Sequence, residues 1–261
     1  MRKRFGQHFL VDRHFIGRIV AAIDPRPGDA MVEIGPGLGA LTAPLVDRLA
    51  HLHAVEIDRD LAARLAERFP AERLTVHVGD VLAFDFASLP ERLRVVGNLP
   101  YNISTPLLFR LAGFAARLAD CTFMLQREVV DRMVAAPATA DYGRLSVMLQ
   151  HRFAMTKLFD VPPGAFRPRP KVDSAVVRMV PRPADELGLH DPALFAAIVA
   201  AAFGQRRKTL RNALSRIVGT GTMERAGIDP GARGETLPVA DFVRLANAAT
   251  AEPRGGAGSP G

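Results

Sequence analysis

The sequence predicts an α/β fold in which a parallel sheet covered by helices is joined to a smaller all-helical domain. Three observations lead to this prediction. Short apolar runs alternate with helix-length amphipathic segments up to about residue 180, glycines follow the first strand-like run, and the pattern beyond residue 181 is purely helical. A chain of 261 residues with 48% hydrophobic content can bury such a core without disulfides.

The expected elements begin as a βαβαβ series. Apolar residues at helical spacing over 12–23 precede the first strand, 30–34, which leads directly into the glycines. Further strands are expected at 52–57, 74–78, 93–97, 121–126, 153–159 and 172–180, and further helices at 40–50, 59–69, 105–114 and 127–135. Because helix-length crossovers separate the early strands, we expect a parallel sheet with ligands bound at its carboxyl edge.

The pattern divides the chain into three parts. Residues 1–181 are expected to form the sheet domain, with a basic N-terminal arm, and residues 182–250 a small helical domain that contains "PALFAAIVAAAF" and the basic "RKTLRNALSRIV". Residues 251–261, "AEPRGGAGSPG", are rich in glycine and predict a disordered tail.

Composition excludes several classes of protein. The single cysteine, Cys121, cannot form an internal disulfide and has no metal-ligand spacing, which fits a reducing compartment. The N-terminal stretch lacks the apolar region of a secretory signal, and no apolar run approaches the length of a membrane span. We therefore expect a cytoplasmic protein without a metal site or a membrane partner.

The net charge of +7 is concentrated in three stretches. Residues 1–20 carry +4, residues 151–180 carry +4 and residues 205–217 carry +5, so the rest of the chain carries −6. Each stretch alone could be a solvated face. Three basic clusters in an otherwise acidic chain favour a polyanionic partner, because phosphate neutralisation is the main sequence-independent source of affinity for nucleic acids.

The stretch "VEIGPGLGALT" carries the first chemical signal, because a strand ends in Gly35, Gly37 and Gly39 just before a helix. Glycines let the backbone turn sharply and approach a ligand, and the helix N-terminus supplies unpaired N–H groups. Glu56, at the end of the next strand, could accept hydrogen bonds from ribose hydroxyls. The alternatives are a purely structural turn for the glycines and a surface acid for Glu56. The pattern favours a nucleotide-like cofactor over both, but it does not decide which cofactor.

The next two strands end in Asp80 and in "GNLPY". Asp80 follows the third strand, and an acid there suits a hydrogen bond from the exocyclic amine of an adenine. The stretch "GNLPY" suits an adenine amine that reacts. Because an adenine amine is a poor nucleophile, a catalyst must offer acceptors to its hydrogens and hold the base rigidly. Asn98 offers an amide oxygen, Pro100 biases Leu99 toward an extended conformation that presents its carbonyl, and Tyr101 offers a face for stacking. The alternative is a tight turn with a half-buried tyrosine.

Six segments together resemble the ribosomal RNA adenine N6-dimethyltransferases, most closely the bacterial small-subunit type: "QHFL", "VEIGPGLGALT", "VEID", "GD", "NLPYNIST" and "FRPRPKVDSAVV". The resemblance implies a Rossmann-like S-adenosylmethionine-dependent methyltransferase sheet with a small all-helical C-terminal domain. The donor contacts that it implies, together with the glycine turn, fall on His8, Leu10, Gly35, Gly37, Glu56, Asp80 and Asn98. His8 departs from the asparagine of many relatives, although both side chains can form hydrogen bonds.

The resemblance also gives roles to the residues that would meet the RNA. Asn98, Leu99 and Tyr101 would be catalytic, and Phe166 would form the second wall of the target-base pocket, facing Tyr101. The alternative for Phe166 is a ring that plugs its loop into the core. The expected RNA contacts are Arg167, Arg169, Lys171, Arg206, Arg207, Lys208 and Arg211.

The sequence thus predicts an S-adenosylmethionine-dependent dimethylation of N6 on two adjacent adenosines near the 3′ end of small-subunit (16S) ribosomal RNA, carried out by a monomer during ribosome biogenesis on a pre-ribosomal 30S particle. No covalent intermediate or metal is expected. Three alternatives stay open: a large-subunit rRNA adenine methyltransferase of the macrolide-resistance type, a nicotinamide dehydrogenase, and an assembly factor whose catalysis is secondary.

Overall fold

The computed structural model describes residues 8–205 and 207–251, and it divides into two compact units. Unit 1 comprises Met1–Val134 and Arg152–Arg182, and unit 2 comprises Ala135–His151 and Pro183–Gly261. The second stretch of unit 2 begins within one residue of the domain boundary expected from the sequence. Residues 135–151, which the sequence placed in the first domain, pack within unit 2 instead. The expected tail falls outside the described residues except for its first residue.

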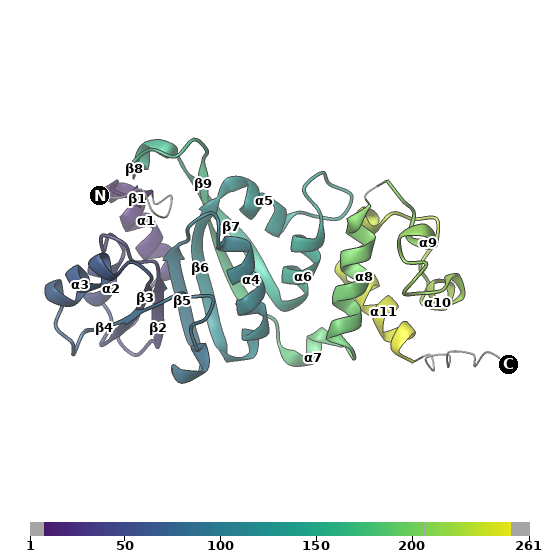
Figure 1. Ribbon diagram of the computed structural model, residues 1–261, viewed down its shortest axis with the longest axis horizontal. Helices are drawn as coiled ribbons and strands as arrows, with labels where there is room; N and C mark the ends of the chain where they lie inside the picture. Colours follow the sequence, from purple (N-terminus) through teal and green to yellow (C-terminus); the bar gives the residue numbers. More distant parts are fainter. Residues whose placement is uncertain (1–7, 206, 252–261) are drawn as a thin grey trace. The chain divides into compact units, whose positions relative to one another are not determined.

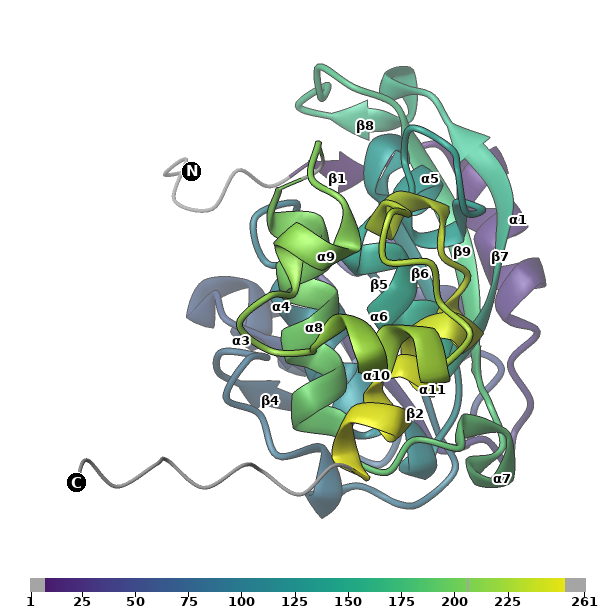
Figure 2. The ribbon, with the colours of Figure 1, turned by 90° about the vertical axis from the view of Figure 1, so that its right-hand side faces the viewer.

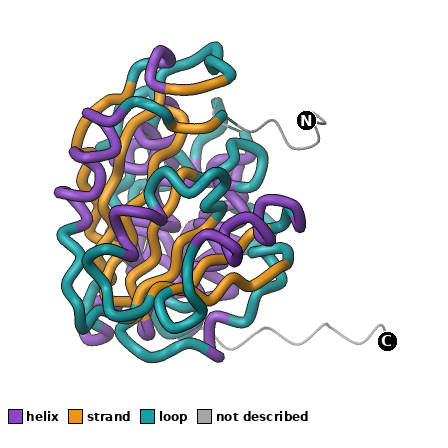
Figure 3. The backbone as a smooth tube through the Cα atoms, turned by 90° about the vertical axis from the view of Figure 1, so that its left-hand side faces the viewer, coloured by secondary structure: helices purple, strands orange, loops and turns teal. Residues whose placement is uncertain are grey.

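Unit 1 is built on a seven-stranded sheet in the order β4-β3-β2-β5-β6-β9-β7. The five strands from β4 to β6 are parallel, and β9 runs antiparallel to both of its neighbours. Their bounds are β2 Met31–Ile34, β3 Leu52–Glu56, β4 Leu74–Val78, β5 Leu93–Asn98, β6 Leu118–Gln126, β7 Phe153–Val161 and β9 Ser174–Pro181. The strands lie side by side in Figure 3 (orange). The expected α/β class is confirmed, with each strand found close to its predicted place.

Helices flank this sheet: α1 Arg13–Ile23, α2 Thr42–Val46, α3 Arg59–Arg68, α4 Ser104–Gly113 and α5 Arg127–Val134. Asp12 caps α1 and Asp58 caps α3, each accepting hydrogen bonds from two backbone N–H groups of the first turn. The first three helices share one hydrophobic core with β2 to β4, and α5 packs on β6, β7 and β9. This arrangement leaves the ends of the strands as the place where loops can form a site.

A second, two-stranded sheet pairs β1 (Phe9–Leu10) with β8 (Phe166–Arg167) (Figure 1). The strands are antiparallel, with Phe9 opposite Arg167 and Leu10 opposite Phe166. The carbonyl of Ala165 accepts hydrogen bonds from the N–H groups of Val11 and Asp12. The start of the described chain is therefore fixed against a loop more than 150 residues away in the sequence.

Gly97, near the end of β5, lies against the end of β2. A Cβ atom at this position would clash with the carbonyl oxygen of Ile34. Only glycine lets the two backbones approach this closely. Gly35, which follows β2, and Asn98, which ends β5, are thereby held at a fixed spacing at the carboxyl edge.

The opposite, amino edge of the sheet contains a buried ionic cluster around Arg94 at the start of β5. Its guanidinium binds both carboxylate oxygens of Asp120 at 2.8 and 2.9 Å and one of Asp29 at 2.6 Å. It also donates to the carbonyls of Ile23 and Asp24. Burial alone would lower the pKa of Arg94, but the hydrogen bonds to Asp120 and Asp29 raise it above its usual range.

Unit 2 is helical (Figure 2). Its helices are α6 Arg144–Arg152, whose last residue already belongs to unit 1, α7 Ala184–Leu187, α8 Pro192–Gly204, α9 Leu210–Ala213, α10 Thr220–Arg225 and α11 Val239–Thr250. Its core surrounds α8 and includes Ala135, Tyr142 and Val147 from the inserted segment. The Tyr142 hydroxyl donates to the carbonyl of Leu237 at 2.8 Å. Helix α6 was not expected from the sequence. Within the described residues, no helix is both long and apolar enough to span a membrane.

Candidate active site

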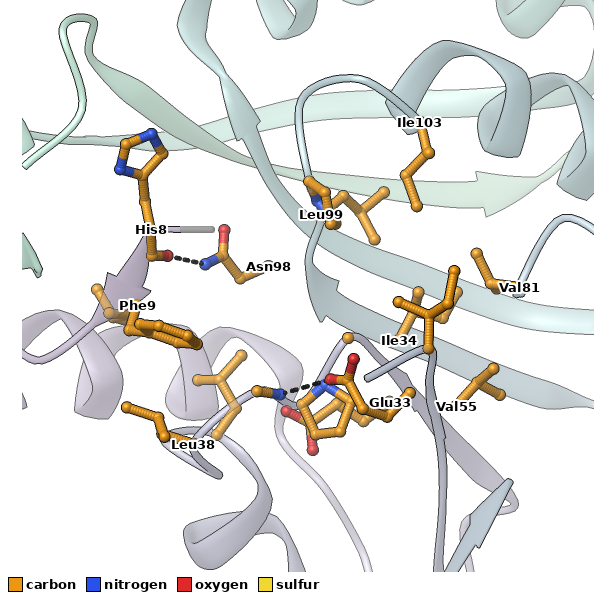
Figure 4. A pocket seen from close by; sticks show the side chains of 18 of the residues that line it. His8, Phe9, Glu33, Ile34, Leu38, Val55, Val81, Asn98, Leu99 and Ile103 are labelled. Carbon is orange, nitrogen blue, oxygen red and sulfur yellow. Dashed lines mark hydrogen bonds between the residues drawn. The ribbon is translucent and has the colours of Figure 1, made fainter. Parts of the chain in front are cut away.

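A cavity of about 240 Å³ opens in unit 1 at the carboxyl ends of the parallel strands (Figure 4). Its walls come from residues 8–10 at the start of the described chain, the turn after β2 and the ends of β3, β4 and β5. The lining residues lie in the ranges 8–10, 33–38, 40–41, 55–57, 79–81 and 98–103. The cavity thus brings together all seven predicted cofactor contacts, Asn98 among them, with the predicted catalytic residues Leu99 and Tyr101.

The glycine turn after β2 adopts the backbone conformation expected of it. Gly35, Gly37 and Gly39 have φ angles of +63°, +57° and +81°, a region that favours glycine. A Cβ atom on Gly37 would lie 3.1 Å from the ring of Phe9. Side chains at this turn would therefore strain the backbone and crowd the cavity wall.

Glu56 holds this turn from the neighbouring strand. Its Oε2 accepts a hydrogen bond from Gly37 N at 3.1 Å, and its Oε1 accepts one from Asp58 N at 3.0 Å. Only 3% of the residue is exposed. Burial raises the pKa of Glu56, and the backbone hydrogen bonds lower it in part. Among the described residues, Glu56 has no ion pair with a cationic side chain.

Glu33, inside the buried strand β2, also lines the cavity and was missed by the sequence analysis. It is 2% exposed, and its Oε2 accepts a hydrogen bond from the Thr42 hydroxyl at 2.7 Å. Burial raises the pKa of Glu33 to about 7, against the lowering effect of Thr42 and with a small contribution from Glu56. The available signal was an acid within the otherwise apolar run "MVEI".

Asn98, the last residue of β5, has a defined amide orientation. Its Nδ2 donates to the backbone carbonyl of His8 at 3.1 Å, a contact drawn in Figure 4. A carbonyl can only accept, so the amide nitrogen must face His8 and Oδ1 must point away from it. Among the described residues, neither Oδ1 of Asn98 nor the carbonyl of Leu99 receives a hydrogen bond. Both residues line the cavity, so a ligand there can donate to either acceptor.

Tyr101 and Asp80 complete the predicted residues at the cavity. The Tyr101 hydroxyl forms a hydrogen bond of 3.1 Å with Ser174 Oγ, and its ring centroid lies 5.8 Å from that of His8. Asp80 is exposed at the cavity rim, and its Oδ1 accepts from Leu82 N at 2.8 Å. Its second carboxylate oxygen has no hydrogen bond within the described chain, so it can accept one from a ligand.

Phe166 is not among the residues that line the cavity. Its ring is 1% exposed and belongs to the core cluster of unit 1, which also contains Leu10. Leu10, in contrast to Phe166, both belongs to this core and lines the cavity. In this conformation Phe166 fits the alternative of a ring that fixes its loop to the core, and its role as a second wall stays a prediction.

The comparisons with known proteins agree with this geometry. The family model described as "Ribosomal RNA adenine dimethylase" matches residues 1–251. The chain belongs to the ribosomal RNA adenine dimethylase family. The dimethylase is 67% identical to the "Ribosomal RNA small subunit methyltransferase A" of Aromatoleum aromaticum over 94% of this chain and 93% of the relative. It is 58% identical to the protein of the same name in Bordetella pertussis, over 100% of this chain and 96% of that one.

Two solved structures resemble the dimethylase over most of its length. The crystal structure of a dimethyladenosine transferase from Plasmodium falciparum matches with a TM-score of 0.80 at 24% identity, covering 91% of this chain and 96% of that one, which shows the shared fold. The structure of the 23S rRNA methyltransferase ErmE matches with a TM-score of 0.70 at 29% identity, covering 93% and 99%. The predicted Rossmann-like methyltransferase fold is confirmed.

The predicted RNA-contacting residues of the dimethylase fall into two groups, one in each unit. Arg167, at the end of β8, and Arg169 and Lys171, on the loop between β8 and β9, are exposed in unit 1. Arg207, Lys208 and Arg211 are exposed around the start of α9 in unit 2, and Arg206 lies outside the described residues. Their contact with RNA stays a prediction.

No group of three or more metal-ligating side chains comes together in the part of the dimethylase that the structure describes. Cys121 is buried in β6, where burial raises the pKa of its thiol above its usual range. A thiol that stays protonated is a poor nucleophile and a poor metal ligand, so Cys121 fits the core residue expected from the sequence.

Proposed function

We propose that this dimethylase transfers methyl groups from S-adenosylmethionine to N6 of adenosines in small-subunit ribosomal RNA, two per base and on two adjacent bases near the 3′ end. Support comes from the family and from relatives at 55–67% identity that are named small subunit methyltransferases. The enzyme would then be an rRNA (adenine-N6,N6)-dimethyltransferase that acts during ribosome biogenesis.

The observation that carries this proposal is the pair of unoccupied acceptors at Asn98 and Leu99. Adenine N6 has two hydrogens and a lone pair that is delocalised into the ring. Acceptors on both hydrogens hold the base in place and leave more electron density on the nitrogen. The half-buried ring of Tyr101 beside these acceptors suits stacking of a purine.

The cavity also fits the proposed donor. S-adenosylmethionine would supply a methyl group on a positively charged sulfur. Glu33 and Glu56 are buried at the cavity without ion pairs to cationic side chains in the described chain, and such groups favour a cationic ligand. The glycine turn would approach the donor closely, Glu56 and Asp80 would accept from its ribose and adenine, and His8 and Leu10 would close the cavity from the N-terminal side.

Catalysis would consist mainly of positioning. The residues would hold the amine and the methyl group in line, so that a nitrogen–carbon bond forms as the carbon–sulfur bond breaks and one proton leaves the nitrogen. After the first transfer only one hydrogen remains on N6, so Asn98 and the Leu99 carbonyl cannot act alike in both transfers. No residue needs to form a covalent bond to the substrate.

Three finer parts of the proposal go beyond the family itself: a pre-ribosomal 30S particle as substrate, a monomeric enzyme and a cytoplasmic location. The basic loop of unit 1 and the basic segment of unit 2 support a polyanionic partner of this kind. A role mainly in subunit assembly uses the same surfaces and is compatible with them.

A second candidate is methylation of large-subunit RNA, which the likeness to the 23S rRNA methyltransferase ErmE favours. One experiment separates the two. Small and large subunits from cells that lack this methylation are incubated with the enzyme and labelled S-adenosylmethionine, and the label is mapped to single bases. We expect dimethyladenosine in small-subunit RNA only, and its loss with Asn98→Ala. Label confined to the large subunit would overturn the first proposal in favour of the second, and label in neither would overturn both.

A further inference from the structure

Two hydrogen bonds connect the loop between β8 and β9 to the residues that face the target base. The first runs through His8, whose ring Nδ1 bonds the carbonyl oxygen of Pro168 at 2.8 Å. The backbone carbonyl of the same residue accepts from Asn98 Nδ2. One residue therefore links the loop to the amide that would bind the adenine.

The second hydrogen bond joins Ser174 Oγ to the hydroxyl of Tyr101 at 3.1 Å. Ser174 is the first residue of β9, 1% exposed, and pairs with Gln126 of β6 on one side and Val161 of β7 on the other. Both neighbouring strands therefore hold this residue in place. A tyrosine hydroxyl bonded to it cannot swing freely.

The loop between these two contacts is itself anchored at both ends. At its start, β8 pairs with β1, which places Pro168 beside His8. At its end, Arg127 donates its N–H to the carbonyl of Asp173 at 3.0 Å and forms an ion pair with the Asp173 carboxylate at 2.9 Å. The loop is thus a defined support for both hydrogen bonds.

We propose that residues 166–174 form a brace that positions the two side chains facing the target base, Asn98 through His8 and Tyr101 through Ser174. His8 and Ser174 are then positioning residues for the methyl transfer. This inference rests on the proposed function, because it assumes that Asn98 and Tyr101 hold an adenine.

The chemistry gives both contacts a purpose. An asparagine amide can turn over by rotation about its last bond, which would present the NH₂ group to the amine hydrogens in place of the oxygen. The His8 carbonyl disfavours that orientation, because two acceptors would then face each other. A tyrosine ring on the turn after Pro100 can likewise tilt, and anchoring its hydroxyl fixes the plane on which the base stacks.

The same loop carries Arg167, Arg169 and Lys171, whose side chains are exposed. Their proposed phosphate contacts and the brace can be separated by kinetics. Loss of a phosphate contact should raise KM for the RNA, whereas loss of the brace should lower kcat, since it disturbs only the alignment of the bound base.

The test of the Ser174 arm is a double-mutant cycle with Ser174→Ala and Tyr101→Phe. Each variant removes one side of the same hydrogen bond. We expect each to lower kcat by about 3- to 10-fold, with unchanged KM for the RNA and unchanged donor affinity, and the double variant to be no worse than either alone. Ser215→Ala is a matched control, because within the described residues its exposed hydroxyl bonds only the Asn212 carbonyl, in unit 2.

A second readout does not depend on activity. The chain has two tyrosines and no tryptophan, so tyrosine ring signals in NMR spectra report on Tyr101 and Tyr142 alone. Ser174→Ala should shift the Tyr101 signals and leave those of Tyr142 in place. Because Tyr101→Phe breaks the hydrogen bond from a half-buried position, it keeps the test valid if Ser174→Ala fails to fold.

The His8 arm has its own pair of variants. His8→Ala removes the contact with Pro168 and should lower kcat by about 3- to 10-fold, whereas His8→Asn can still donate to that carbonyl and should stay near the parent.

Effects of Ser174→Ala and Tyr101→Phe that multiply in the double variant would overturn the Ser174 arm. A parent value of kcat for His8→Ala would overturn the His8 arm. If the parent enzyme methylates no small-subunit adenine, the proposed function fails, while unshifted Tyr101 signals would overturn the Ser174 arm separately.

Discussion

At the amino edge of the large sheet, Arg94 is surrounded by Asp120, Asp29 and two backbone carbonyls, whereas at the carboxyl edge Glu33 and Glu56 are buried without ion pairs to cationic side chains in the described chain. Both edges remove charged groups from water. Only at the amino edge does the protein itself supply partners of opposite charge. The cluster at the amino edge therefore stabilises the fold, whereas the acids at the carboxyl edge leave room for a charged ligand. Variants at each edge can test this difference.

The largest effect is expected at the amino edge. Asp120→Ala leaves Arg94 buried without its bidentate partner, which should lower the free energy of unfolding by about 3 to 5 kcal/mol. Urea denaturation measures this. Arg26→Ala is the control, because its ion pair with Asp24 is exposed, with 71% of the Arg26 side chain accessible, and should change the value by less than about 1 kcal/mol. Equal losses for both variants would contradict the compensated role of Arg94.

The next effect concerns Glu33 and pH. Its pKa is raised to about 7 in the folded protein from an ordinary 4.5, so the folded state binds more protons than the unfolded state between these values. The contribution of Glu33 to stability is therefore present below pH 4.5 and is lost as the pH rises through 7. Glu33→Gln should remove this loss, which urea denaturation at pH 5, 6, 7 and 8 measures. The exposed Glu128→Gln should follow the parent, and a Glu33→Gln profile parallel to the parent would contradict the prediction.

A similar effect is expected on donor binding. Glu56→Ala removes both the buried charge and the acceptor of Gly37 N, and should weaken S-adenosylmethionine binding by about 1.5 to 3 kcal/mol in calorimetry. Glu56→Gln keeps one acceptor oxygen and should lose less. The demethylated product has a neutral sulfur, so its affinity should fall less than that of the donor. Unchanged donor affinity in Glu56→Ala would remove this residue from the site.

The smallest effect returns to the amino edge. Arg178 is the second partner of Asp120, at 2.8 Å, but its side chain is 44% exposed. Arg178→Ala should lower the free energy of unfolding by no more than about 1 kcal/mol, because Arg94 still compensates the carboxylate. A loss as large as that of Asp120→Ala would mean that Arg178, and not Arg94, carries the ionic cluster.

Most of the site could be predicted from the sequence because its residues follow strand ends. In a parallel sheet the turn after β2, Glu56, Asp80 and Asn98 must meet at one edge, wherever the rest of the chain lies. Glu33 could not be found this way, since its burial and its bond to Thr42 depend on packing within the fold. Ser174 was missed for a related reason, because 73 residues separate it from Tyr101.

The fold shows the same division. Strands and long helices follow from local apolar patterns, so their places were predicted well. The membership of residues 135–151 in unit 2 follows from the packing of Tyr142 and Val147 in one core with helices that begin 45 or more residues later. Local patterns carry no information about such contacts. The buried position of Phe166 likewise depends on pairing with Leu10 at the other end of unit 1 in sequence.

The contact between Gly97 and Ile34 has a consequence for engineering. The backbone before the glycine turn packs directly against the backbone before Asn98. The donor side of the cavity, at the glycine turn, and the acceptor side, at Asn98, are therefore held at one fixed distance. A library aimed at other bases can vary the loops at the rim, where side chains have room. Position 97 tolerates no side chain, because a Cβ atom there would displace the backbone of Ile34 and, with it, the turn that follows.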